Sequence, residues 1–197
     1  MSLSADALSG LIESNLSAYG KGGVNRKKFC DGLAKGIVMT IVGKPFITQD
    51  IGTVAGAGVG NGTGIKGLMY DDMTMLALAI MPSKGVNAKK LYDAINQAVV
   101  QHLQSSASLK STHAPVAIGT GTVMHISSIL IPEMAQNIDT MLMSQGAKGV
   151  NRKIFGLCCA TGICTDILKN STGQVIIIGS PVGIPAPGAG VGAGVIS

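Results

Sequence analysis

The 197-residue sequence contains no tryptophan, and aromatic residues make up only 3% of it. Because aromatic side chains bury the largest apolar areas, the core must be built from Ile, Val, Leu, Ala and the ten methionines. Such a core is thin, and small units with thin cores depend on neighbours for stability. Charged residues are also scarce, at 13%, but hydrophobic residues reach 46%, a balance that excludes an intrinsically disordered chain.

Long apolar runs and targeting signals are missing as well. Charged residues interrupt the apolar stretches, so that none approaches the roughly 18–20 residues of a membrane span. These interruptions are Lys35, Lys44, Asp71 and Asp72. Residues 1–9 lack both the basic segment and the apolar stretch of a secretory signal. We therefore expect a protein made in the cytoplasm, neither secreted nor inserted in a membrane.

Glycine, by contrast, is abundant, with 28 residues that lack the three-residue period of collagen. Instead, one string recurs as GVNRKKF, GVNAKKL and GVNRKIF, at 23–29, 85–91 and 149–155. A second marker, Ile-Gly-Thr or Ile-Gly-Ser, follows each copy, at 51–53, 118–120 and 178–180. Two markers in the same order three times predict three tandem units of about 62 residues: 1–63, 64–124 and 125–197.

Each recurring string is expected to begin a helix. Its asparagine is a preferred N-cap, and the preceding valine would pack on the residue five positions later. These positions are Asn25, Asn87 and Asn151 for the cap, and Val24/Phe29, Val86/Leu91 and Val150/Phe155 for the apolar pairs. Apolar residues then recur at helical spacing, at Leu33/Ile95/Cys159, Ile37/Val99/Ile163 and Ile41/Leu103/Ile167. One further position is always small (Gly36, Ala98, Gly162), which predicts close contact with another helix.

A second helix is expected before each string, and β structure after it. The helices are predicted at 5–19, 65–81 and 126–144, with Pro132 either kinking the third or making it start late. The β-like segments are 46–48, 116–118 and 175–178. Glycine runs at 56–60 and 188–192 follow the first and third of these. The prediction is an α+β fold of three helix–helix–strand repeats, with glycine-rich extended segments and an extended tail at 181–197. The repeats would have three small cores and together form one compact domain.

The glycine runs satisfy the spacing of a dinucleotide-binding motif only in part, and Lys66-Gly67 does not fit a phosphate-binding loop. Because no helix follows the second run, we interpret both as extended segments that pair with another strand, including one of a neighbouring subunit. A small-molecule site at these runs is an alternative. The candidate interaction residues are Gly56, Gly58, Gly60, Gly188, Gly190 and Gly192.

No catalytic, metal or cofactor site is predicted. Cys158, Cys159 and Cys164 fall on a helix without a second ligand pair, and Cys30 stands alone, so all four thiols are expected to be reduced and the helical ones buried. The three histidines lie 11 and 12 residues apart, without a nucleophile in a triad pattern. The acidic pair at 71–72 suits a helix start better than acid–base chemistry.

Basic residues cluster at the predicted start of each recurring helix. Because positive charge there opposes the helix dipole, the recurrence suggests a use. Three interpretations are open. The basic residues could pair with acidic subunit surfaces, they could be solvent-exposed residues inherited from one ancestral module without a use, or they could contact phosphate. The residues are Arg26, Lys27, Lys28, Lys89, Lys90, Arg152 and Lys153.

The glycine-rich Ile-Gly-Thr segments after short helices, the Met-rich middle and the extended tail resemble small structural proteins of tailed-bacteriophage particles. The resemblance implies a non-enzymatic virion component of the neck, tail, baseplate or capsid. Unpaired glycine-rich strands suggest that it oligomerises by strand and tail exchange, with itself and with other structural subunits as partners. The alternative is a nucleic-acid-associated protein that uses the basic helix starts, although a net charge of +5 and few aromatics argue against a dedicated nucleic-acid reader.

Overall fold

The chain alternates two helices with two strands, three times over. The computed structural model describes residues 3–20, 23, 25–53, 58–80, 86–113, 118–149, 151–171, 173–180 and 187–196. The helices are α1 (Ala5–Ala18), α2 (Arg26–Ile41), α3 (Tyr70–Ile80), α4 (Val86–Ser106), α5 (Ile131–Ser144) and α6 (Asn151–Asn170). The strands are β1 (Pro45–Thr53), β2 (Gly58–Thr63), β3 (Ser108–His113), β4 (Ile118–Ser127), β5 (Gly173–Ser180) and β6 (Pro187–Ile196). The predicted α+β class is therefore confirmed.

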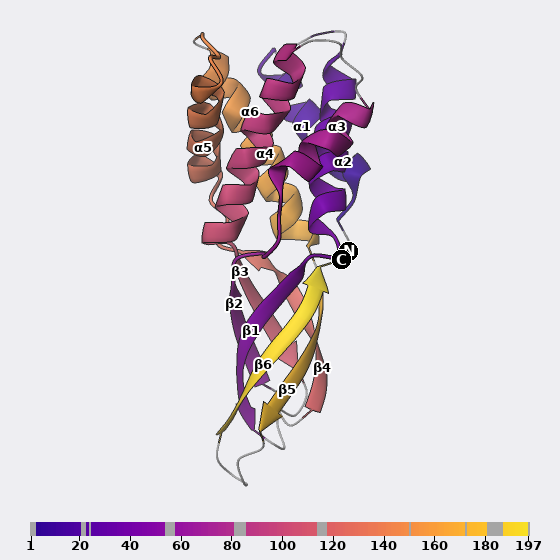
Figure 1. Cartoon of the computed structure of the whole chain (residues 1–197), viewed down its shortest axis with the longest axis vertical. Coiled ribbons are helices and arrows are strands. Elements are labelled where there is room, and N and C mark those ends of the chain that lie inside the picture. Colours follow the sequence, from indigo (N-terminus) through magenta and orange to yellow (C-terminus); the bar gives the residue numbers. More distant parts are fainter. Residues whose placement is uncertain are drawn as a thin grey trace.

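Helices and strands separate into two stacked parts of an elongated molecule (Figure 1). All the helices form one bundle, and all the strands form a twisted sheet at one end of it. Since α2, α4 and α6 each lead directly into a strand, they run toward the sheet, whereas α1, α3 and α5 run away from it. Each helix contacts its neighbours along the chain, and α6 contacts α1, so that the bundle is a closed ring.

The sheet closes on itself in the order β1-β2-β3-β4-β5-β6, with every neighbouring pair antiparallel. The glycine-rich strand β6 completes the closure, because it pairs with β1 from Pro187 to Val195 and with β5 from Ala189 to Ile196. Of the expected extension at 181–197, residues 187–196 form a strand of the chain's own sheet, and the remaining residues lie outside the described part of the chain. Strand β2 is likewise paired on both sides, with β1 and β3.

Glycines on the inner face let such a small sheet close. Eight strands already enclose an interior just wide enough for side chains, so six leave less room. Gly60 and Gly62 are buried, and in β6 glycines alternate along the face that ends at Ile196, which is 2% exposed. Where the sheet meets the bundle, the larger side chains of Phe46, Leu109 and Ile126 fill the interior, each at most 1% exposed.

The predicted apolar positions of the recurring helices form the centre of the bundle. Nine of them are fully buried, at 0% exposure: Leu33, Ile37, Ile41, Ile95, Val99, Leu103, Cys159, Ile163 and Ile167. The apolar spacing read from the sequence is therefore confirmed in α2, α4 and α6. These side chains belong to one continuous cluster that extends into the mouth of the sheet. The prediction of three small cores is wrong, because the recurring helices bury the same face against one another.

The expected close contacts at the small positions are also confirmed. A Cβ added to Gly36 would overlap the carbonyl oxygen of Met73 in α3. A Cβ on Gly162 would lie 2.7 Å from Cγ1 of Ile12 in α1. Ala98, at the matching place in α4, is fully buried. These positions bring neighbouring helix backbones together.

Three of the six aromatic side chains gather where α2, α4 and α6, the central helices of the bundle, begin. The rings of Phe29 and Tyr92 stack with centroids 5.4 Å apart, and Phe155 lies 5.7 Å from Phe29 at a tilt. The Tyr92 hydroxyl donates a hydrogen bond to the Phe29 carbonyl oxygen at 3.3 Å. The scarce aromatics thus join three helices that are distant in sequence.

Several boundaries differ from the predicted ones. Helices α3 and α5 begin at Tyr70 and Ile131, later than expected, and Pro132 stands in the first turn of α5, where its fixed φ suits a helix start. Strand β3 was not predicted, whereas β2 and β6 overlap the segments that were predicted to be extended. Of the segment 116–118, only Ile118 is described, at the start of β4.

The prediction that an asparagine side chain caps each recurring helix is not confirmed. Asn25 flanks α2 without a side-chain capping hydrogen bond, whereas Asn87 lies inside α4 and Asn151 begins α6. The preceding glycines supply acceptors instead, since the Arg26 and Arg152 amides donate to the carbonyls of Gly23 and Gly149, at 3.0 and 3.3 Å. The valine side chains of the expected apolar pairs, at 24, 86 and 150, lie outside the described residues.

If glycine is needed on the inner face, substitutions at two adjacent positions of β2 should differ in their effect on stability. Gly62→Val should lower the free energy of unfolding by about 1–3 kcal/mol, because the added side chain overpacks the interior. Asn61→Val, at an exposed neighbouring position, should change it by no more than about 0.5 kcal/mol. Urea titrations followed by circular dichroism measure both. Equal effects would contradict the proposed constraint on the interior.

Candidate functional site

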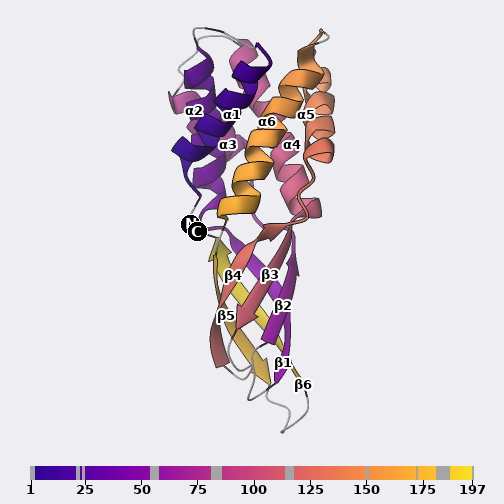
Figure 2. The same ribbon diagram turned by 180° about the vertical axis from the view of Figure 1, so that it is seen from behind.

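The three basic clusters of the sequence lie together at the end of the bundle farthest from the sheet. Helices α2, α4 and α6 begin there, and each cluster occupies the first turn (Figure 2). We call this the far end. Eight of the 15 lysines and arginines of the chain are among its described residues: Arg26, Lys27, Lys28, Lys89, Lys90, Lys148, Arg152 and Lys153.

The acidic helix starts lie at the opposite end of the bundle. Asp6, Asp71, Asp72 and Glu133 occupy the first turns of α1, α3 and α5, which begin beside the sheet. Carboxylates there suit the positive end of each helix dipole, as predicted for the pair at 71–72. The bundle therefore separates negative helix starts near the sheet from positive ones at the far end.

The two arginines of the far end hold helices together. Arg26 of α2 lies 3.6 Å from the Glu13 carboxylate of α1. Arg152 of α6 pairs with Asp139 of α5 and also donates from Nη1 to the Ala147 carbonyl oxygen at 3.2 Å. These cations therefore have structural partners within the chain.

Two lysines of the far end are paired within their own helices. The Nζ atom of Lys27 lies 2.9 Å from Asp31, and that of Lys89 lies 2.6 Å from Asp93. These hydrogen bonds raise the pKa of both lysines above its ordinary value. Because both ammonium groups are largely exposed, each pair adds little to stability.

Four lysines of the far end make no ion pair with any described residue: Lys28, Lys90, Lys148 and Lys153. All four are exposed. Lys148, in the turn between α5 and α6, was missed because it lies outside the recurring string. The alternation of helix directions was the signal that could have placed the clusters together. These four unpaired cations are the available charge of the far end.

An apolar groove lies beside two of these lysines, Lys90 and Lys148. It consists of two adjoining depressions of about 400 and 320 Å³ that share Leu91, Leu142 and Ala147. Phe155 completes the apolar lining, and Lys90 and Lys148 stand at the rim. The far end thus offers an apolar groove and cations side by side, an arrangement suited to an acidic, partly apolar partner surface.

The glycine candidates lie elsewhere. Gly58 and Gly60 belong to β2, and Gly188, Gly190 and Gly192 to β6, in the sheet. Gly56 is outside the described residues. The structure therefore does not bring the glycine and basic candidates together, and the described glycines have backbone partners within the sheet.

The cysteines have the environment predicted for them. All four are free and buried. Burial raises the pKa of the Cys30 and Cys164 thiols to about 12 and also raises that of Cys159, which disfavours the reactive thiolate. Among the described residues, no group of three or more His, Cys, Asp or Glu side chains could hold a metal ion. The side chains of His113 and His125 lie outside what the structure describes.

A buried polar side chain occupies the same place near the end of each central helix. Thr40, His102 and Asp166 are 4%, 1% and 0% exposed, and each directly precedes a fully buried apolar residue. The Nε2 atom of His102 accepts a hydrogen bond from the Leu130 amide at 3.2 Å, and burial lowers the pKa of this histidine. The Asp166 carboxylate accepts a hydrogen bond from Asn170 at 2.7 Å, but its second oxygen has no partner among the described residues.

Because Asp166 is buried, replacing it with a neutral residue should stabilise the folded protein by an amount that depends on pH. Desolvation raises the pKa of this carboxyl, although the hydrogen bond from Asn170 lowers it in part. A raised pKa means that the folded state binds the proton more tightly, so stability falls as pH rises from the unfolded value near 3.9. Asp166→Asn should raise the melting temperature at neutral pH by about 2–4 °C. The difference should shrink at acidic pH in scanning calorimetry, and a pH-independent difference would contradict the assignment.

In the part of the chain that the structure describes, no helix has the length and apolar character needed to cross a membrane. No protein-family model matches the chain, and no curated protein or solved structure is detectably similar to it. The case for a function therefore rests on the fold and on the geometry of the far end.

Proposed function

We propose that the chain is a non-enzymatic structural and assembly protein that binds another subunit through the far end of its bundle. In line with the resemblance of the sequence, we place it in the virion of a tailed bacteriophage, at the neck, tail, baseplate or capsid. The partners would be other structural subunits or further copies of the chain. The strand and tail exchange suggested by the sequence would require β2 or β6 to leave partners within the chain, so we propose contact between folded surfaces as the main mode of assembly.

One observation carries this proposal: the fold collects exposed cations and an apolar groove at a single end, with Lys90 and Lys148 lining the groove. Four lysines there have no ionic partner among the described residues. Positive charge at a helix start is unfavourable by some tenths of a kcal/mol for each residue, which an external carboxylate would offset. Apolar contacts at Leu91, Leu142 and Phe155 would supply affinity, and the lysines would orient the partner.

We further propose that the chain contains three copies of one module. The order of helices and strands supports this, as does the burial of matching positions in α2, α4 and α6. Three related modules around one axis would give the far end an approximate threefold character. Such an end would fit a partner whose own symmetry is a multiple of three.

Nucleic acid is the second candidate partner, because the same lysines could contact phosphates. The apolar part of the groove argues against it, since the side chains of Leu91, Leu142 and Ala147 offer phosphate no hydrogen-bond donor. A partner with both carboxylates and apolar side chains could contact the lysines and the apolar groove together. Salt-dependent binding of nucleic acid at the far end would favour the alternative.

A zero-length carbodiimide cross-linker tests the proposed contact directly in the native assembly. The reagent joins a lysine amine to a carboxylate only where the two are in contact. We expect Lys28, Lys90, Lys148 and Lys153 to be joined to aspartates or glutamates of another polypeptide, as identified by mass spectrometry. Exposed lysines away from the far end provide the matched control and should remain unjoined: Lys35, Lys66 and Lys110.

Two results would overturn the proposal. One is an equal yield of intermolecular cross-links at the control lysines, which would mean that the far end is not the contact. The other is the recovery, after ultraviolet irradiation, of nucleotides bound to the far-end lysines. That result would favour the nucleic-acid alternative.

A further inference from the structure

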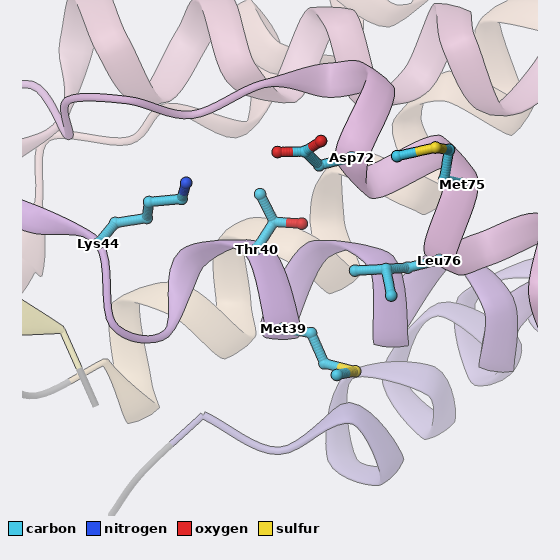
Figure 3. Close-up of a pocket in the computed structure, with 6 residues that line it drawn as sticks. All are labelled: Met39, Thr40, Lys44, Asp72, Met75 and Leu76. Carbon is cyan, nitrogen blue, oxygen red and sulfur yellow. The ribbon is translucent and has the colours of Figure 1, made fainter.

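A second groove lies between α2 and α3, close to the sheet and away from the far end. It has a volume of about 410 Å³ and is lined by six residues: Met39, Thr40, Lys44, Asp72, Met75 and Leu76. Figure 3 shows Thr40 projecting from α2 toward α3, and Lys44 and Asp72 reaching toward one another from opposite sides. We call it the α2–α3 groove.

The walls of the α2–α3 groove include two strongly exposed methionines. Met39 is 52% exposed and Met75 is 65% exposed, on the two helices that form the groove. Methionine is flexible and polarisable, and proteins use it where one surface must adapt to an apolar partner. A side chain of moderate size could therefore pack between α2 and α3.

The floor of the groove contains a polar group without a partner. Thr40 is only 4% exposed, and its Oγ1 atom has no hydrogen-bond partner among the described residues. An unsatisfied buried hydroxyl is unfavourable by about 1–3 kcal/mol, whereas a hydroxyl can both donate and accept. A ligand with a hydrogen-bonding group would remove that cost.

The corresponding place in α4 shows how the chain satisfies such a position internally. His102 stands 62 residues after Thr40, is 1% exposed, and accepts a hydrogen bond from the Leu130 amide that precedes α5. Threonine is smaller than histidine and makes no such bond to α3. The α2–α3 junction therefore leaves open both space and a hydrogen-bonding group that the α4–α5 junction fills.

The charges of the groove identify the kind of ligand. Lys44 donates hydrogen bonds, Asp72 accepts them, and no ion pair joins the two. A peptide backbone offers C=O and N–H groups to match both, together with a side chain for the methionine walls. A fatty acid or a phosphate could pair with Lys44 but would also bring negative charge toward Asp72, whereas a neutral peptide group suits both.

We infer that the α2–α3 groove binds a peptide segment of a partner protein, with one apolar side chain between the methionines. The backbone of that segment would hydrogen-bond to Thr40, Lys44 and Asp72. The α2–α3 groove is separate from the far end. If the proposed function is wrong, this inference about the groove can still hold.

The probe for this inference is N-acetyl-L-leucine methylamide, which has two backbone amides and one apolar side chain. Binding is followed by NMR of ¹³C-methyl-labelled methionines in the full chain. We expect saturable shifts of the Met39 and Met75 methyl signals. Met69 and Met143, which are 55% and 56% exposed and do not line the groove, are the matched controls and should not shift.

Two substitutions at one position test the hydroxyl. Thr40→Val keeps the shape but removes the hydrogen-bonding group, and should weaken probe binding about two- to tenfold. Thr40→Ser keeps the hydroxyl and should bind more tightly than Thr40→Val. Since Oγ1 has no partner within the described chain, neither substitution should unfold the protein, as circular dichroism can verify.

Three outcomes would overturn the inference. The first is a lack of saturable shifts at Met39 and Met75, or equal shifts at the control methionines. The second is a Thr40→Val variant that is folded and binds the probe as tightly as the parent. The third is a shift of both groove signals with protein concentration alone, which would identify a second copy of the chain as the occupant.

Discussion

The pairing of β6 with both β1 and β5 is the interaction on which the rest of the structure depends. It converts an open sheet with two free edges into a closed one and joins the last segment of the chain to the first hairpin. A six-stranded interior is narrow, and alternating glycines leave the space that closure needs. The glycines of the strands are thus explained by the closure of the chain's own sheet.

Closure also sets the arrangement of the helices. The α3–α4 and α5–α6 pairs each connect two strands that are neighbours in the closed sheet, and the α1–α2 pair leads into β1. The three pairs therefore form a ring at one end of the sheet. The central helices share one core, whose apolar cluster continues into the mouth of the sheet at Phe46, Leu109 and Ile126. Because every central helix runs toward the sheet, every basic helix start lies at the far end. The proposed contact surface is therefore a consequence of topology.

Local and periodic features of this protein could be predicted from its sequence. The buried positions of α2, α4 and α6 followed from apolar spacing, and the close contacts of Gly36 and Gly162 followed from recurrent small residues. Strand β3 was missed because Ser108–His113 is largely polar, and its place is set by pairing with β2 and β4. Closure itself depends on register between distant segments, which no local pattern encodes.

The candidate site could be predicted only in part. The basic clusters were found because their sequence recurs. Only the structure distinguishes their members, because Arg26 and Arg152 pair with carboxylates of other helices, whereas Lys28, Lys90 and Lys153 make no such pair with a described residue. Lys148 and the α2–α3 groove left no repeated signal. The significance of the unsatisfied Thr40 hydroxyl follows from comparison with His102, whose partner, the Leu130 amide, directly precedes α5.

In this structure the chain closes its own sheet, and β6 needs no strand from another molecule. Amide hydrogen exchange of 187–196, measured over a wide range of protein concentration, tests this closure. Strong protection of these amides that does not change with dilution is the predicted result, because β1 and β5 of the same chain provide the acceptors. Protection that disappears on dilution would contradict intrachain closure, since the strand would then depend on a neighbouring chain.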